Sequence, residues 1–107
     1  MARGKRYESV LNRVKKAIKA LESSKDLDFT EKYVSLGKER GFSVECDRME
    51  DDLVDENGNV VYERKGAAVG FVVYYQENGR DRDSCSLSYF SDEENMRSVA
   101  AFVKMYV

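Results

Sequence analysis

The spacing of apolar residues changes along this chain from a helical to a strand period, and that change limits the fold to a mixture of helix and strand. In residues 6–21 the apolar residues recur every three or four positions, which places them on one stripe of an amphipathic helix. This stripe consists of Tyr7, Val10, Leu11, Val14, Ile18 and Leu21. From Phe42 onward, apolar and polar residues alternate, as expected for a half-buried strand. In a chain of 107 residues, both periods together predict one α+β domain.

Two further helices are predicted from capping residues. Thr30 is a good N-cap for a short second helix, and Gly41 can supply its left-handed stop. Ser91 and Glu94 form a capping box at the start of the last helix. The buried stripe of this last helix is predicted to be Met96, Val99, Ala100, Val103 and Tyr106.

The second half of the chain reads as antiparallel strands joined by hairpins. Residues 67–76 form the strongest strand, and Asn78-Gly79 begins the return to a last strand at 84–90. A three-residue loop is preferred there over a two-residue loop, because a slip of one residue turns a strand inside out. The three-residue loop puts Cys85, Leu87 and Tyr89 on the same face as Val69, Phe71, Val73 and Tyr75.

Asn57-Gly58 predicts another hairpin, which differs from the first in its charge. Residues 50–56 before the turn are highly acidic, so this hairpin is expected to project into solvent. A two-residue loop would place Asp51 opposite Arg64 and Glu50 opposite Lys65, and the opposite charges favour that register.

The predicted order is therefore α-α-β-β-β-β-α. Two N-terminal helices and one C-terminal helix pack on an antiparallel sheet of three to four strands, with three if the acidic hairpin is irregular. Residues 1–107 form a single α+β domain. Within it, residues 1–22 are a basic amphipathic helix, and 29–107 hold the second helix, the sheet and the C-terminal helix.

The composition argues against catalysis and metal binding. The chain has no histidine, which is the commonest general base and zinc ligand. A calcium-binding loop with its glycine at Gly58 would begin at Leu53 and end at Arg64, and neither offers a carboxylate. The serines of the last strand have no base to activate them. We therefore expect no enzyme, no cofactor and no metal site.

The sequence also lacks the marks of export. No segment has the roughly 18 consecutive apolar residues that a membrane helix needs, and no apolar signal-peptide core follows the basic amino terminus. We expect a cytoplasmic protein without membrane association. Cys46 and Cys85 are expected to be free buried thiols, with a disulfide or a reactive thiol as the alternative.

Charge asymmetry supplies two hypotheses for function. Residues 1–20 hold seven basic residues and one acidic residue, a net charge of +6, whereas residues 21–107 carry −8. The first hypothesis is a small protein-binding module, an inhibitor or accessory protein of the phage or mobile-element type, whose partner is a protein. Its candidate binding residues are Glu50, Asp51, Asp52, Asp55 and Glu56 of the hairpin and Tyr74 of the exposed sheet face.

The alternative hypothesis is a nucleic-acid-binding protein that uses the first helix. A basic helix face can contact phosphates, although it can equally be a solvated surface or dock on an acidic protein. The candidate nucleic-acid-binding residues are Arg3, Lys5, Arg6, Arg13, Lys16 and Lys19.

Overall fold

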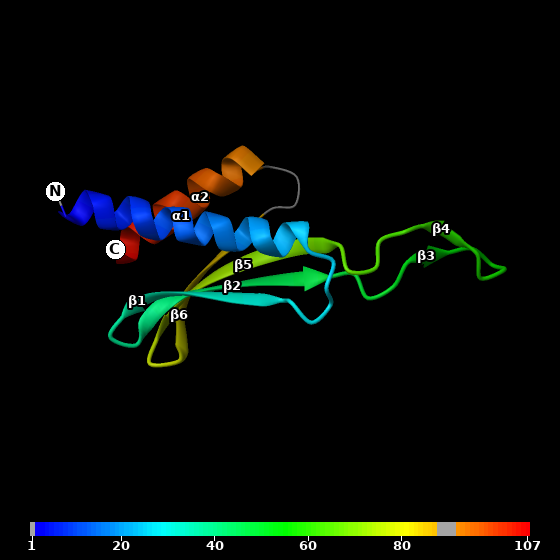
Figure 1. Cartoon of the computed structure of the whole chain (residues 1–107), viewed down its shortest axis with the longest axis horizontal. Coiled ribbons are helices and arrows are strands. Elements are labelled where there is room, and N and C mark those ends of the chain that lie inside the picture. The colour runs from blue at the N-terminus through cyan, green and yellow to red at the C-terminus, as the bar shows by residue number, and fades with distance from the viewer. Residues whose placement is uncertain (1, 88–91) are drawn as a thin grey trace.

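The computed structural model describes residues 2–87 and 92–107, with the side chains of all of these except residues 2, 3 and 92. Helix α1 (Ala2–Ser23) and helix α2 (Asp92–Tyr106) form one layer, and a four-stranded antiparallel sheet forms the other. Both helices lie on the same face of the sheet (Figure 1). In spatial order, the strands are β1 (Glu31–Gly37), β2 (Arg40–Arg48), β5 (Ala68–Glu77) and β6 (Arg80–Leu87). The predicted α+β class with an antiparallel sheet is confirmed.

The acidic hairpin is inserted between two neighbouring strands of the sheet. Strands β3 (Leu53–Val54) and β4 (Val60–Tyr62) form a separate two-stranded sheet between β2 and β5 in the chain. Figure 1 shows this hairpin extending well beyond the body of the protein. It gives the molecule a long axis of 61 Å against 28 and 19 Å for the other two.

The predicted second helix is wrong, because residues 31–37 form the edge strand β1. The described part of the chain therefore holds two helices instead of three. Val34 is buried and Leu36 is half-buried, whereas Tyr33 and Ser35 are exposed, which is the period of a strand. Gly41, the predicted helix stop, lies within β2, and the Tyr33 ring packs over it. Pairing of β1 with β2 thus outweighs the helix-capping signal at Thr30.

The turn between β1 and β2 explains why the hairpin was not recognised. Its central residues, Lys38 and Glu39, have φ angles of 52° and 60°, so both are left-handed. Hairpin turns of this kind are normally built from Asn and Gly. Lys-Glu is an unusual sequence for such a turn and gives no signal that a hairpin is present.

The faces of β5 and β6 are as predicted from Phe71 onward, although the connection between the strands is not. Val69 was predicted on the same face but is exposed, because the pairing of β2 with β5 shifts there. Leu87 lies opposite Phe71, so the apolar side chains of both strands face the helices. The loop consists of Asn78 and Gly79 alone, with Glu77 opposite Arg80 on either side. A bulge then leaves residue 82 without a partner in the ladder, and this extra residue restores the parity that a three-residue loop would have given. Residues 88–91, with the predicted strand end and Ser91, lie outside the described residues.

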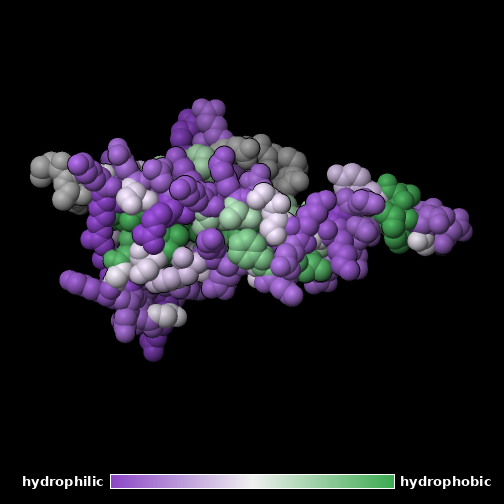
Figure 2. All heavy atoms as spheres, viewed as in Figure 1, coloured by the Kyte–Doolittle hydropathy of each residue, from purple (hydrophilic) through white to green (hydrophobic). Residues whose placement is uncertain are grey.

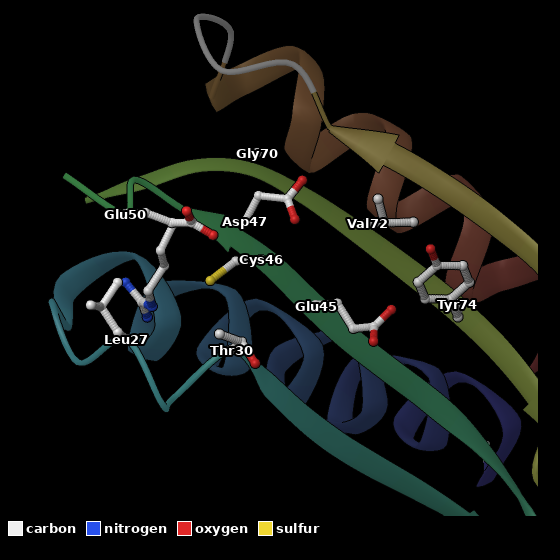
Figure 3. Close-up of a pocket in the computed structure, with 10 residues that line it drawn as sticks. Leu27, Thr30, Glu45, Cys46, Asp47, Glu50, Gly70, Val72 and Tyr74 are labelled. Carbon is white, nitrogen blue, oxygen red and sulfur yellow. The ribbon is translucent and has the colours of Figure 1, made fainter. Parts of the chain in front are cut away.

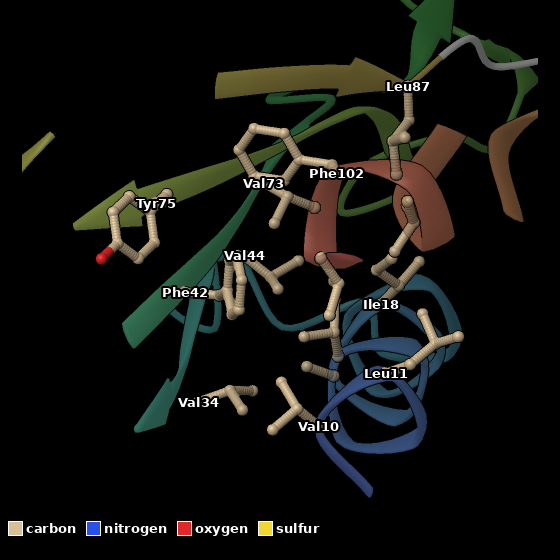
Figure 4. Close-up of a cluster of buried hydrophobic side chains, with 14 of the residues drawn as sticks. Val10, Leu11, Ile18, Val34, Phe42, Val44, Val73, Tyr75, Leu87 and Phe102 are labelled. Carbon is tan, nitrogen blue, oxygen red and sulfur yellow. The ribbon is translucent and has the colours of Figure 1, made fainter. Parts of the chain in front are cut away.

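One cluster of apolar side chains fills the space between the helices and the sheet (Figure 4). All six residues of the predicted α1 stripe contribute to it, with Tyr7 only half-buried. In α2, Val99 and Val103 are buried as predicted, whereas Met96, Ala100 and Tyr106 are half-buried. Phe102 was not predicted and is buried, with its ring edge-on to Phe42. The sheet contributes Val34, Phe42, Val44, Cys46, Val73, Tyr75 and Leu87.

The end of α2 is fastened to the sheet through Tyr106. Its ring stacks on Tyr75 with 3.8 Å between the ring centroids, and its hydroxyl donates a hydrogen bond to Asp83. Arg40 donates to the Tyr75 hydroxyl at 2.6 Å and to the Tyr106 carbonyl at 2.8 Å. The bond to Asp83 raises the pKa of Tyr106 to about 12, so the hydroxyl keeps its proton at neutral pH.

Arg48, at the end of β2, is the only charged side chain that is buried among the described residues. Its Nε donates to the Phe29 carbonyl at 2.9 Å, and one terminal nitrogen donates to the Leu21 carbonyl at 2.6 Å. The other terminal nitrogen donates to the carbonyls of Ser24 and, at 2.9 Å, Gly66. The guanidinium thereby satisfies free carbonyls at the carboxyl end of α1, where the helix dipole favours a positive charge.

Gly66 brings the base of the hairpin against the linker that follows α1, beside the carbonyls that Arg48 binds. Its φ is 82°, and a Cβ there would lie 2.1 Å from the carbonyl oxygen of Lys25. Two backbone hydrogen bonds close this base, which we call the neck. They run from Met49 N to Ala67 O at 2.9 Å and from Gly66 N to Met49 O at 2.8 Å.

Removing the Arg48 guanidinium is expected to destabilise the whole fold. Arg48→Met leaves four carbonyls without their donor, and we expect the free energy of unfolding to fall by about 3 kcal/mol. Urea unfolding measures the loss. Arg97→Met on the exposed face of α2 is the matched control and should change stability by less than about 0.5 kcal/mol. Equal effects of the two substitutions would contradict the assignment.

Exchanging the residues of the two hairpin turns is expected to change stability in opposite directions. Lys38→Asn with Glu39→Gly should raise the free energy of unfolding by about 1 kcal/mol, because these residues adopt left-handed angles more readily. The reciprocal change, Asn78→Lys with Gly79→Glu, should lower it by a similar amount. Thermal unfolding of both variants tests this, and a loss of stability in the first would contradict it.

Candidate functional site

The hairpin exposes large apolar side chains far from the core. We define the arm as residues 50–65. Its apolar side chains are exposed by 45% at Leu53, 52% at Val54, 53% at Val60, 59% at Val61 and 66% at Tyr62. Figure 2 shows an apolar patch on the arm, separated from the body by polar residues. Contiguous exposed apolar side chains rimmed by polar residues are typical of a binding surface.

Two of the predicted arm carboxylates maintain the shape of the arm. Asp52 accepts hydrogen bonds at 2.8 Å from the backbone N–H groups of Lys65 and Arg64, and these bonds lower its pKa. Asp55 accepts two backbone hydrogen bonds at 2.9 Å within the turn at the tip. Both residues therefore have a structural role in the free protein.

The other arm carboxylates have no such structural role. Within the described residues, the side chains of Glu50, Asp51 and Glu56 form no ion pair or hydrogen bond. The predicted pairing of Asp51 with Arg64 and of Glu50 with Lys65 is not formed as ion pairs. Instead, Arg64 Nε donates to the backbone carbonyl of Asp51 at 3.4 Å. The ladder shifts between Leu53 and Val54, so the predicted two-residue register holds at the Leu53–Tyr62 pair but not at the Val54–Val60 pair nearer the tip.

Neither described helix covers the second face of the sheet, which we call the open sheet face. This face carries a hollow next to the arm. The hollow has a volume of about 580 Å³ (Figure 3). Its lining includes Leu27, Thr30, Glu45, Asp47, Glu50, Gly70, Val72 and Tyr74. Tyr74 was predicted to belong to a binding face and is half-buried there. Since Glu50 also begins the arm, the hollow and the arm form one continuous surface.

The open sheet face is strongly acidic. Burial raises the pKa of Glu45, and the nearby carboxylates of Glu31, Asp81 and Asp47 raise it further. None of these four carboxylates takes part in an ion pair in the described part of the chain. Arg48 is the only basic side chain among the residues that line the hollow, and its guanidinium is bound to backbone carbonyls. A surface of this sign favours a positively charged partner.

The basic residues predicted to contact nucleic acid divide into two groups. Arg6 donates to the carbonyl of Leu36 at 2.9 Å, and Arg13 donates to that of Ser35 at 3.3 Å. These two arginines lie along the edge strand β1. The side chains that are exposed and make no such contact are Lys5, Lys16 and Lys19. The side chain of Arg3 lies outside the described residues.

The remaining described residues hold few groups that could carry chemistry. No group of three or more Cys, Asp or Glu side chains in this part of the chain could hold a metal ion. Cys46 is buried, Cys85 is half-buried, and both are free thiols. Burial raises the pKa of each thiol, so little reactive thiolate is present at neutral pH. Neither described helix has the length and apolarity needed to cross a bilayer.

Sequence reasoning found the arm but missed its apolar side chains. The signal was available, because the arm was expected to project, and an apolar residue on a projection has no core to enter. It also missed Glu45 and Asp47, which alternate with the buried residues Val44 and Cys46 and therefore face outward.

Comparisons with protein-family models, with curated proteins and with solved structures give no significant match to this chain. What the protein does is therefore inferred from its own surfaces.

Neutralising Glu45 is expected to stabilise the protein at neutral pH. Its folded-state pKa is raised, so the ionised carboxylate costs free energy only in the folded state. This cost is absent at low pH and appears as the pH rises through the folded-state pKa. Glu45→Gln should therefore raise the free energy of unfolding at pH 7, and the gain should vanish near pH 3. Urea unfolding across this range tests the prediction, with exposed Glu22→Gln as the control.

Proposed function

We propose that this protein is a non-enzymatic binding module that docks its arm, together with the acidic sheet face beside it, on a partner protein. The observation that carries the proposal is the group of five apolar side chains exposed on a projection. Water-exposed apolar surface favours association, and a projecting hairpin can present it without steric hindrance from the body.

Charge supports a partner that is basic. The arm holds six acidic and two basic residues, a net charge of −4, and the sheet face adds unpaired carboxylates. Such a field accelerates encounter with a basic surface and repels acidic ones. By covering a basic surface on its partner, this protein would act as an inhibitor or accessory protein.

The alternative, nucleic-acid binding by α1, now rests on Lys5, Lys16 and Lys19. Arg6 and Arg13 are engaged with β1 and would have to leave it to contact phosphates. If this alternative operates, Lys16→Glu with Lys19→Glu should abolish binding to duplex RNA or DNA at low salt.

Changing the arm is expected to remove the partner without unfolding the protein. In affinity purification from cells that naturally express the chain, Tyr62→Ser should weaken partner binding by about 30-fold, the effect of losing a central aromatic contact. Replacing residues 50–65 by Asn-Gly should abolish binding, while the neck bonds of Met49 still close the hairpin. Circular dichroism and thermal unfolding verify that the body remains folded.

Met105→Ser provides the matched control. Met105 is 68% exposed on α2, so this change also removes a large exposed apolar side chain, but away from the arm. Its binding should equal that of the unaltered chain. Equal recovery of a partner by the unaltered chain and by the Asn-Gly replacement would contradict the proposal. Recovery of nucleic acid alone, lost on reversing Lys16 and Lys19, would favour the alternative.

A further inference from the structure

The arm is apolar on both of its faces. Leu53 and Val54 are adjacent in β3, so their side chains point to opposite faces of the ribbon. Leu53 lies opposite Tyr62 and Val54 lies opposite Val60, so each face carries a cross-strand apolar pair. Val61 is the extra residue where the ladder shifts and adds a fifth apolar side chain.

Neither face of the arm is covered by the other residues that the structure describes. All five of these side chains are between 45% and 66% exposed, and none belongs to the core cluster. A hairpin that docks on a flat surface needs only one apolar face, and its other face is normally polar. An isolated two-stranded hairpin is also marginally stable in water. Enclosure of both faces would bury the apolar pairs and stabilise the ribbon at the same time.

Acidic side chains lie at both ends of this apolar segment. Glu50 and Asp51 precede it at the neck, Glu63 follows it there, and Glu56 lies at the tip. Their side chains make no hydrogen bond or ion pair within the described residues. A partner that surrounds the arm therefore meets carboxylates at the entrance and at the far end of its binding site.

A second copy of the chain fits these requirements poorly. Two arms laid together would bring net charges of −4 against each other. The basic helix α1 has the complementary charge, but its apolar stripe is already buried against the sheet, so it offers lysines without an apolar cleft.

We propose that the arm inserts into a cleft of a basic partner protein, with the Leu53–Tyr62 pair on one apolar wall and the Val54–Val60 pair on the opposite wall. Lysine or arginine side chains at the mouth and floor of the cleft pair with the carboxylates of the neck and the tip. This inference rests on the proposed function and specifies the shape and chemistry of the partner site.

Photo-crosslinking from adjacent positions tests the insertion. The full chain is made with p-benzoylphenylalanine at Leu53, at Val54 or, as the control, at Met105, and is expressed in its native cells. We expect positions 53 and 54 to cross-link the same polypeptide, and mass spectrometry to place the two sites on opposite walls of one apolar cleft bordered by lysine or arginine. Position 105 should give no such product.

Variants of each face provide the second measurement, with the cross-linked protein as the purified partner. Leu53→Ser/Tyr62→Ser and Val54→Ser/Val60→Ser should each weaken binding at least tenfold. If only one of the two face variants weakens binding, or only one position cross-links, the arm is not enclosed by a cleft. The proposed binding function would still hold in that case. A partner recovered by affinity purification that gives no cross-link from positions 53 and 54 would overturn arm insertion. A product containing only a second copy of the chain would do the same, and no protein product from any position would count against both proposals.

Discussion

The buried guanidinium of Arg48 is the interaction on which the arrangement of the other elements depends. Among the described residues it has no carboxylate partner, and it donates to backbone carbonyls from the end of α1, the following linker and the loop before β5. A buried charge is tolerated only when its hydrogen-bonding capacity is satisfied, so these segments have to meet at one point. That point is also the neck, where Gly66 approaches Lys25 too closely for any side chain. Arg48 therefore links the packing of the body to the placement of the arm.

The two faces of the sheet differ in what covers them. The face under α1 and α2 contains the apolar core, and the hydrogen bond from Tyr106 to Asp83 holds the last helix on it. The opposite face has no helix over it, and desolvation together with mutual repulsion raises the pKa of Glu45 there. Arg6 and Arg13 lie along the edge strand β1 and occupy two of its carbonyls, which makes that edge a poorer template for another strand. The surfaces left for contact are the arm and the open face.

The parts of the fold that sequence predicted are those where local pattern and tertiary packing agree. The α1 stripe and the faces of β5 and β6 follow directly from hydrophobic period. Strand β1 was missed because Thr30 resembles a helix cap and Lys38-Glu39 does not resemble a turn, so only its pairing with β2 reveals it. The role of Arg48 was equally hidden, because its partners are backbone carbonyls from distant segments. In the arm, charge identified the segment, but which carboxylates are structural, as at Asp52, depends on hydrogen bonds that composition does not show.

The neck has a consequence for how such a protein can diversify. Backbone hydrogen bonds at Met49 close the sheet before the arm begins, and no arm residue enters the core. Residues 50–65 can therefore be replaced as a unit without disturbing the body. If the arm binds a partner as proposed, substitutions or changes of length there would alter recognition without the stability cost that usually limits binding-site evolution. The body held by Arg48 would then be a constant scaffold for arms selected against different targets.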